Sequence, residues 1–208
     1  MSRRPNTEQR RIEIVNALLA TMAEYGYEKA TILLIAKKAE LASGLLHYHF
    51  KTKAEILLAL VKTLAELGRK RYIDFAKSAT TPEEKLHAYI HARLAKGRGA
   101  DPKAAAAWVI IGAEAVRQAE VRAVYQEAVK AEFVLLRSLL TACLKDKNKQ
   151  LKNVQQLTAG LLAYMEGAFQ LASAAPDVMP ADYAAVTAID MVQRYIDGEK
   201  SPIRRQRS

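Results

Sequence analysis

Apolar residues recur at spacings of three and four along most of the chain. In the first segment Val15, Leu18 and Met22 follow this spacing, and Gly26 stands where a helix would end in a left-handed residue. This pattern predicts a helix over about 8–25. Alternating Val, Ile or Thr residues bounded by Asn-Gly or Asp-Gly turns do not occur in the sequence. The pattern therefore predicts an all-α protein.

Two short helices follow the first helix at close spacing. Thr31 is placed to cap a helix that reaches about Ala39, and a third helix is predicted over about 43–50. Two short helices joined by a tight turn are typical of a helix-turn-helix. The first three helices are thus expected to form an N-terminal three-helix bundle.

Capping signals start the later helices. Thr52 and Glu55 have the spacing of a capping box, and they precede a long helix to about residue 76. Thr81 followed by Pro82 gives a similar start for a helix that ends near Gly97. Four more helices complete a prediction of about nine, over roughly 102–117, 120–145, 153–174 and 181–196.

Charge changes this picture by suggesting a partner. Lys and Arg total 32 against 22 Asp and Glu, for a net charge of +10 and a pI near 9.7. Such a balance favours a polyanion, either nucleic acid or an anionic membrane. The longest apolar run, near 104–113, is too short to span a bilayer, and no apolar stretch follows the N-terminal arginines. With Cys143 as the single cysteine, these features predict a soluble cytoplasmic protein without disulfides or a structural metal.

Three segments carry a resemblance to a known family. They are residues 25–31, 35–39 and 44–55, which read YGYEKAT, IAKKA and GLLHYHFKTKAE. Their order, spacing and aromatic residues are similar to the N-terminal signature of TetR-type transcriptional regulators. The resemblance covers about a quarter of the chain and implies a DNA-binding helix-turn-helix.

The resemblance also implies which residues meet double-stranded DNA. Leu46 and Phe50, four residues apart, would pack the third helix on the first two. His47, Tyr48 and His49 would then reach the bases. The full DNA-binding set includes the start of the helix and two phosphate contacts, and it is Thr31, Ser43, Gly44, Leu45, His47, Tyr48, His49 and Lys53. The alternative is a small helical core whose histidines are merely solvated.

The N-terminal arginines leave two interpretations open. Arg3, Arg4, Arg10 and Arg11 form either an ordinary solvated tail or a basic arm that lies along the DNA backbone or minor groove.

Three positions depart from the family pattern. Glu40 stands in the turn where the family usually has Gly, and a left-handed backbone there would cost about 1 kcal/mol, so a distorted turn is expected. Ala42 replaces the usual Ser cap of the third helix, unless Ser43 takes that role. Leu33 and Leu34 replace residues that are commonly polar, which predicts fewer phosphate contacts from the second helix.

The resemblance divides the chain into a DNA-binding domain over 8–68, a larger helical domain over 69–198 and a basic tail over 199–208. The larger domain is expected to bind a small-molecule effector and to form a homodimer through residues of about 153–196. Gly160 and Gly167 would allow close helix contact across a two-fold axis. Packing within one chain is the alternative.

Aromatic and acidic residues of the middle helices are the candidates for the effector site. They are Tyr89, Trp108, Glu114, Phe133, Tyr164, Glu166 and Phe169. The two glutamates would suit a cationic ligand beside an aromatic ring. Core filling by the aromatics and an ion pair between Glu114 and Arg117 are the alternatives. No cofactor is expected, and no metal, although His87 and His91 share a helical face.

The sequence favours regulation over two other classes of function. No phosphate loop, dinucleotide fingerprint or nucleophile elbow supports a small helical enzyme. A basic protein of the membrane surface or a scaffold would need a helix with separate basic and bulky apolar faces, which the first helix matches only loosely. The resulting hypothesis is a repressor that an effector releases from a palindromic operator.

Overall fold

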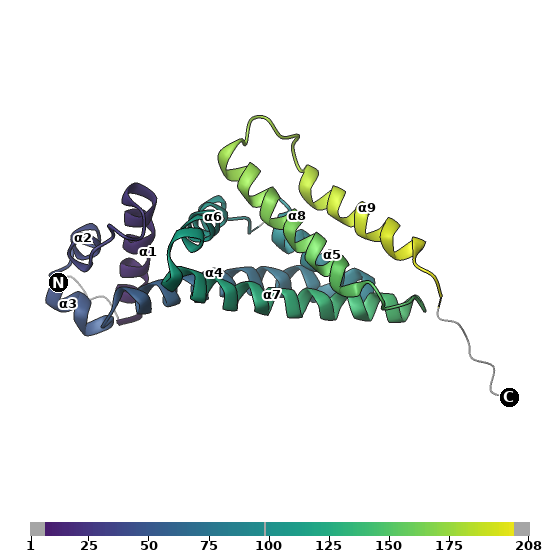
Figure 1. Cartoon of the computed structure of the whole chain (residues 1–208), viewed down its shortest axis with the longest axis horizontal. Helices are drawn as coiled ribbons and strands as arrows, with labels where there is room; N and C mark the ends of the chain where they lie inside the picture. Colours follow the sequence, from purple (N-terminus) through teal and green to yellow (C-terminus); the bar gives the residue numbers. More distant parts are fainter. Residues whose placement is uncertain (1–6, 98, 202–208) are drawn as a thin grey trace. The chain divides into compact units, whose positions relative to one another are not determined.

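The computed structural model describes residues 7–97 and 99–201, and this part of the chain contains nine α-helices, one 3-10 helix and no strand (Figure 1). The prediction of an all-α fold is confirmed. The predicted basic arm residues Arg3 and Arg4 and the tail beyond 201 lie outside the described residues. The elements are α1 Thr7–Tyr25, α2 Ile32–Lys38, α3 Ser43–His49, α4 Lys53–Phe75, η1 Ala76–Ser78, α5 Pro82–Leu94, α6 Pro102–Arg117, α7 Ala119–Asp146, α8 Val154–Ala174 and α9 Tyr183–Gly198.

The helices form two compact units. The first unit contains the residues up to 66 together with 103–128, and the second contains 67–102 together with the residues from 129 onward. Two long helices, α4 and α7, therefore contribute residues to both units. The predicted domain boundaries at 8–68 and 69–198 follow the sequence order and stay a prediction.

The core of the first unit begins where α1, α2 and α3 pack on one another. Ile14 and Leu18 of α1 are fully buried, as are Ile35 of α2 and Leu46 of α3. Their spacing gives each helix one apolar stripe, and burial of that stripe supplies most of the stability of such short helices. The predicted three-helix bundle is the result.

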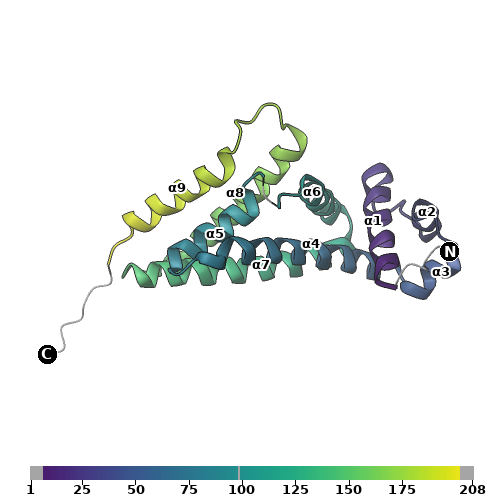
Figure 2. The same cartoon turned by 180° about the vertical axis from the view of Figure 1, so that it is seen from behind.

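The second unit packs α5 against α8 and α9. Leu86 and Tyr89 of α5 share a buried cluster with Leu136 of α7, Met165 of α8 and Val192 of α9. Figure 2 shows α8 and α9 from behind, as the arms of a helical hairpin. Buried apolar residues from four helices thus form one continuous core in this unit.

The capping box at Thr81 is confirmed in both directions. Its hydroxyl accepts a hydrogen bond from the backbone of Glu84 at 3.1 Å, and the Glu84 carboxylate accepts one from the backbone of Thr81 at 3.0 Å. Hydrogen bonds from the backbones of Thr81 and Thr80 lower the pKa of Glu84 to about 2. The carboxylate is therefore ionised at neutral pH, where it satisfies donors at the start of α5.

The predicted box at Thr52 differs in one bond. The Thr52 hydroxyl accepts from the backbone of Glu55 at 3.2 Å, as expected. The Glu55 carboxylate instead accepts from the backbone of Lys51 at 2.8 Å, one residue earlier than the box requires. The backbone N–H groups of Glu55 and Lys51 are therefore both bonded, in a loop that is one residue longer than a capping box.

The last helix is shifted relative to its predicted range of 181–196. It begins at Tyr183 because Asp182 has a φ of 55°, which lies outside the helical region. It runs on through Gly198, and Glu199 is its C-cap. Across the residues that the structure describes, no helix has the length and apolar character needed to cross a membrane.

Candidate DNA-binding surface and effector site

Helix α3 has one buried side and one exposed side. Leu46 is fully buried and Phe50, directly after the helix, is 1% exposed, so this side packs against the rest of the first unit. His47 and Gly44 are exposed, and Tyr48 is 72% exposed. The helix therefore presents polar and aromatic groups outward while its apolar side holds it in place, as a helix that enters the major groove must do.

The predicted set on α3 is not uniformly accessible. Leu45 is exposed, whereas Ser43 and His49 are half-buried. The His49 ring meets Tyr48 edge-on at 5.2 Å, and its Nδ1 atom is buried without a hydrogen-bond partner in the described structure. Of the predicted set on α3, Gly44, Leu45, His47 and Tyr48 are therefore the exposed members.

The turn before α3 is left-handed at Glu40, which has a φ of 55°. The backbone N–H of Leu41 donates to the carbonyl of Ala36 at 2.9 Å, and that of Glu40 donates to the carbonyl of Lys37 at 3.2 Å. This is the bonding that normally closes a helix on a glycine. The expectation of a distorted turn is wrong, because Glu40 itself adopts the left-handed conformation that glycine usually supplies.

The start of α3 lacks a side-chain cap. Ala42 is the N-cap residue with extended backbone angles, and its side chain makes no capping hydrogen bond. The alternative in which Ser43 becomes the cap is wrong, since Ser43 is the first residue inside the helix. The start of α3 therefore presents backbone N–H groups without the usual serine hydroxyl.

Arg11 of α1 holds the other end of α3, a role that the sequence did not reveal. Its guanidinium donates to the carbonyl of His49 at 2.7 Å and lies 4.0 Å from the centre of the Phe50 ring. Arg10 forms an ion pair with Glu13 at 2.7 Å. For these two arginines, the structure shows contacts within the unit in place of a solvated tail. Sequence patterns did not indicate the contact between Arg11 and His49, because these residues are 38 positions apart.

Thr31 and Lys53 lie at the starts of α2 and α4. The Thr31 hydroxyl accepts from the backbone of Leu34 at 3.2 Å as the cap of α2, which leaves its own O–H able to donate. Lys53 donates to the carbonyl of Tyr27 at 2.8 Å, and its ammonium lies 4.0 Å from the centre of the Tyr27 ring. Burial lowers the pKa of Lys53. Lys53 thus also ties α4 to the turn between α1 and α2.

The same turn meets α6 and α7 within the first unit. The Tyr27 hydroxyl donates to the Glu120 carboxylate of α7 at 2.7 Å. A Cβ atom added to Gly26 would lie 3.1 Å from a carboxylate oxygen of Glu114. The same oxygen forms an ion pair with the guanidinium of Arg117 at 2.6 Å. Gly26, with a φ of 79°, therefore serves both the left-handed turn and the close approach of α6. The ion pair that the sequence offered as the alternative role of Glu114 is confirmed.

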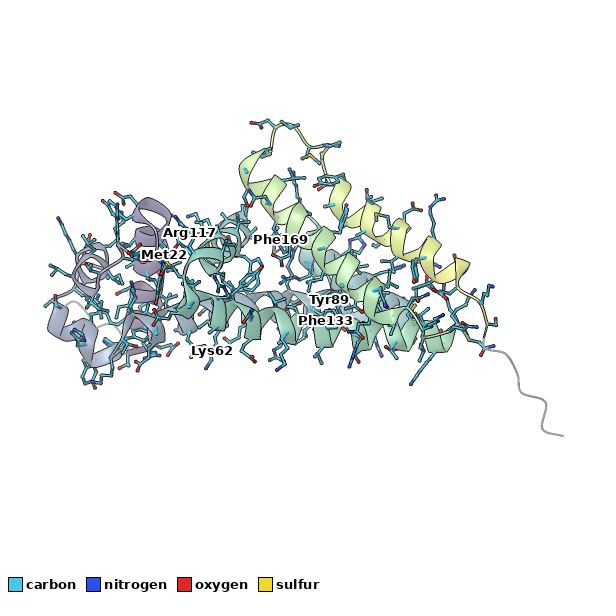
Figure 3. All side chains as sticks on the ribbon, in the orientation of Figure 1. Met22, Lys62, Tyr89, Arg117, Phe133 and Phe169 are labelled. Carbon is cyan, nitrogen blue, oxygen red and sulfur yellow. The ribbon has the colours of Figure 1, made fainter. Side chains whose placement is uncertain are left out.

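The predicted effector residues fall into two groups. Trp108 and Glu114 belong to the first unit, where Trp108 packs on Tyr125 with ring centres 4.9 Å apart. The other five belong to the second unit, and they are Tyr89, Phe133, Tyr164, Glu166 and Phe169. Figure 3 labels Tyr89, Phe133 and Phe169 among its side chains.

Within the second unit, Tyr89 and Phe169 surround charged groups that the sequence did not single out. The Tyr89 hydroxyl donates a hydrogen bond to the Glu132 carboxylate, and the other oxygen of that carboxylate lies 3.9 Å from Arg93. The Arg93 guanidinium lies 5.1 Å from the centre of the Phe169 ring. Burial and the charge of Glu132 raise the pKa of Tyr89, so its hydroxyl stays protonated at neutral pH.

Tyr164 and the two histidines lie elsewhere. The Tyr164 hydroxyl donates to the carbonyl of Ala184 at 3.1 Å and so links α8 to the start of α9. His91 stacks on Phe75 with ring centres 6.1 Å apart, and His87 lies 4.0 Å from the Glu83 carboxylate. In the described residues, no three His, Cys, Asp or Glu side chains gather as a metal site would require.

Two family models match the chain. The model described as "Bacterial regulatory proteins, tetR family" matches residues 14–60, which include α2 and α3. The model described as "BetI-type transcriptional repressor, C-terminal" matches residues 82–199, more than half of the chain. The chain belongs to the TetR family. It is therefore a helix-turn-helix transcriptional regulator and not an enzyme.

Relatives and solved structures agree with this TetR-family assignment. The HTH-type transcriptional regulator BetI of Rhizobium meliloti (strain 1021) is 28% identical over 163 residues, which are 77% of this chain and 76% of the relative. A putative transcriptional regulator of Pseudomonas aeruginosa PAO1 has a TM-score of 0.75 at 19% identity, over 94% of this chain and 92% of that chain. A putative regulator of Saccharomonospora viridis solved in complex with choline has a TM-score of 0.67 at 18% identity, over 92% and 97% of the two chains. These structural likenesses show the fold.

Proposed function

We propose that this TetR-family regulator is a cytoplasmic homodimer that represses transcription from a palindromic operator until an effector binds to its second unit. The observation that carries the proposal is the division of α3 into a buried side, with Leu46 and Phe50, and an exposed side with His47 and Tyr48. Two such helices related by a two-fold axis would enter successive major grooves of a palindrome. The net charge of +10 supports attraction to DNA.

The proposed DNA contacts separate into two kinds. His47, Tyr48 and Leu45 are exposed on α3 and would meet base edges, together with Ser43, Gly44 and the half-buried His49. Thr31 and Lys53, at helix starts, would meet phosphates. Phosphate contacts position the protein without reading sequence, so specificity is assigned to α3.

The proposed dimer interface is the face formed by α8 and α9. A groove of about 320 Å³ lies along these helices, lined by Leu157, Gly160, Tyr164, Met191 and Tyr195 among others. Cβ atoms added to Gly160 or Gly167 would meet nothing within 4 Å in the single chain. Two exposed glycines on one helix cost helix stability, and a second chain that approaches closely would offset that cost.

The proposed effector site is the cluster around Tyr89 and Phe169 in the second unit. Aromatic side chains from α5 and α8 meet charged groups there, which is typical of a small-molecule site. The choline complex of the Saccharomonospora viridis protein supports an effector in this fold. At 18% identity, that choline does not transfer to this chain, whose own residues must decide the effector's chemistry.

The first experiment selects genomic fragments with the purified full-length protein and titrates the best fragment by fluorescence anisotropy at two salt concentrations. We expect a palindrome-centred site that is bound tightly in the presence of random competitor DNA. Binding that collapses with salt and ignores sequence would contradict the proposal. Anionic vesicles at matched salt test the membrane-surface alternative.

Substitution of the exposed side of α3 tests which residues read DNA. We expect Tyr48→Ala or His47→Ala to weaken operator binding roughly tenfold to hundredfold, because each lost base contact costs about 1–3 kcal/mol. The Tyr25→Ala variant is the control, since Tyr25 is an exposed tyrosine of the same unit outside α3. Unchanged operator affinity in both α3 variants would mean that another element reads the sequence.

A further inference from the structure

Helix α3 lacks the side chains that usually read bases through hydrogen bonds. Its seven residues read SGLLHYH. In the major groove, Arg or Lys pairs with guanine, Asn or Gln pairs with adenine, and Asp or Glu accepts from cytosine. None of these six residue types occurs in α3. Base recognition by this helix must therefore use other chemistry.

The hydrogen-bonding groups that α3 does carry discriminate poorly between bases. His47 is exposed, whereas His49 is half-buried and its Nδ1 atom has no hydrogen-bond partner in the described structure. An imidazole N–H that donates to the N7 atom of a purine bonds adenine and guanine alike, because both bases present that acceptor. The Tyr48 hydroxyl is both a donor and an acceptor, so it can bond the edge of any base. Discrimination requires a further feature.

Two bulky apolar surfaces lie on the exposed side of α3. Leu45 is 43% exposed and Tyr48 is 72% exposed. They are three positions apart, a spacing at which side chains are neighbours on one face of a helix. Among the four bases of DNA, only thymine presents a methyl group in the major groove. Contact with that methyl group would remove apolar surface from water on both molecules.

Gly44 allows this part of α3 to come close to DNA. A Cβ atom added to Gly44 would meet nothing within 4 Å, so packing within the chain does not require a glycine there. A glycine inside a helix costs stability relative to alanine. Close approach of DNA to the bare backbone would offset that cost, and it would bring the adjacent Leu45 within reach of a base edge.

We infer that Leu45, with the ring of Tyr48 beside it, reads the C5-methyl group of a thymine in each half of the operator. This inference rests on the proposed function and names the chemistry by which α3 selects its operator. Cytosine has no methyl group, so a change from T·A to C·G removes the apolar contact as well as altering the hydrogen-bonding pattern.

The test replaces thymines of the operator with deoxyuridine, which removes the methyl group and keeps the hydrogen bonds of the base pair. The operator is the duplex selected from genomic fragments, and anisotropy titrations with the full-length protein measure each substituted duplex. At one thymine position, replaced in both half-sites, we expect binding to weaken about fifteenfold, or about fourfold for each lost methyl contact. Deoxyuridine outside the half-sites is the DNA control and should leave the dissociation constant unchanged.

Protein variants separate a methyl contact from an effect on DNA shape. Leu45→Ala should bind the thymine operator more weakly and should no longer distinguish thymine from deoxyuridine at that position. Leu45→Met keeps an apolar side chain of similar volume and should retain the discrimination. Leu58→Ala removes an exposed leucine of α4 in the same unit and should behave as the wild type does. Urea denaturation checks that each variant is folded at the titration temperature.

The results for the inference and for the proposed function are distinguishable. The inference is overturned if no deoxyuridine substitution in the half-sites weakens binding by the wild type. It is also overturned if Leu45→Ala loses affinity by the same factor as the wild type at every thymine, because the substitution would then act through DNA shape or another residue. Either result leaves the proposed function intact. Failure to select any operator would contradict the proposed function, and the inference would fall with it.

Discussion

At the scale of single residues, the turn between α2 and α3 depends on one unusual backbone conformation. Glu40 has a φ of 55° although it carries a Cβ atom, and the Leu41 to Ala36 hydrogen bond forms around it. For an L residue this conformation costs about 1 kcal/mol, which neighbouring hydrogen bonds offset. The position of α3 is thus maintained at a local cost in stability.

Glu40→Gly should therefore stabilise the protein. We expect the free energy of unfolding to rise by about 1 kcal/mol, since glycine adopts the left-handed region without the Cβ penalty. Chemical denaturation with urea measures the change. Glu40→Ala is the matched control, because it removes the carboxylate but keeps the Cβ atom. An equal gain in both variants would show that charge, and not backbone conformation, limits stability at this position.

At the scale of helices, the ends of α3 are held by unequal means. Ala42 gives the start no side-chain hydrogen bond, whereas Arg11 bonds the carbonyl of His49 and stacks on Phe50 at the other end. A helix of seven residues has little stability of its own. Its orientation is consequently set by the buried Leu46 and by the contact from α1.

Helix α8 shows the opposite situation, a long helix with one face open. Gly160 and Gly167 are exposed, and two turns of helix separate them. Met191 of α9 is 52% exposed beside the same groove. These features are typical of a face that a second helix pair covers.

Gly160→Gln tests this face. We expect the variant to form dimers at least tenfold more weakly, because a long side chain would separate the helices that Gly160 allows to approach. Sedimentation across a concentration series measures the dimer dissociation constant. Ala131→Gln, at an exposed position of α7, is the control for the added side chain. Unchanged dimerisation by the Gly160 variant would exclude this face as the interface.

At the scale of the whole molecule, α7 contributes side-chain contacts to both units. It supplies Glu120, which bonds Tyr27 in the first unit, and Glu132, which bonds Tyr89 in the second. The backbone carbonyl of Tyr27 also accepts a hydrogen bond from the ammonium group of Lys53 in α4. A ligand that changes the contacts of Glu132 would act on a helix that also contacts the DNA-binding bundle, provided that it binds one arrangement better than the other.

Tyr27→Phe should weaken this coupling. The variant removes the hydroxyl that bonds Glu120 and keeps the ring beneath Lys53. We expect operator affinity without effector to change by less than a factor of about ten, since one hydrogen bond to an exposed carboxylate contributes about 0.5–1.5 kcal/mol. The factor by which the effector weakens operator binding should fall.

Anisotropy titrations with and without effector measure that factor. Tyr25→Phe is the control, because it removes a hydroxyl that bonds Glu24 within α1 and leaves the contact with α7 in place. An unchanged factor for Tyr27→Phe would mean that the signal travels without this hydrogen bond.

Local patterns in the sequence were enough to predict the helices and the protein family. Apolar spacing predicted nine helices, and Thr31 and Thr81 marked two starts correctly, because periodicity and capping depend on residues a few positions apart. The resemblance to TetR-type regulators, confirmed by the family models, came from a similarly local set of residues. Boundaries failed where a single backbone angle decided them, as at Asp182.

Only the tertiary structure decided which distant residues meet. Arg11 reaches α3 across 38 positions, and Tyr27 reaches Glu120 across 93. Arg93, Glu132 and Phe169 come together from three helices, and nothing in the local sequence marks them as partners. The sequence determined the elements and the family because these depend on short-range spacing. The charge and contacts of the proposed effector site depend on how the helices pack, so they required the folded chain.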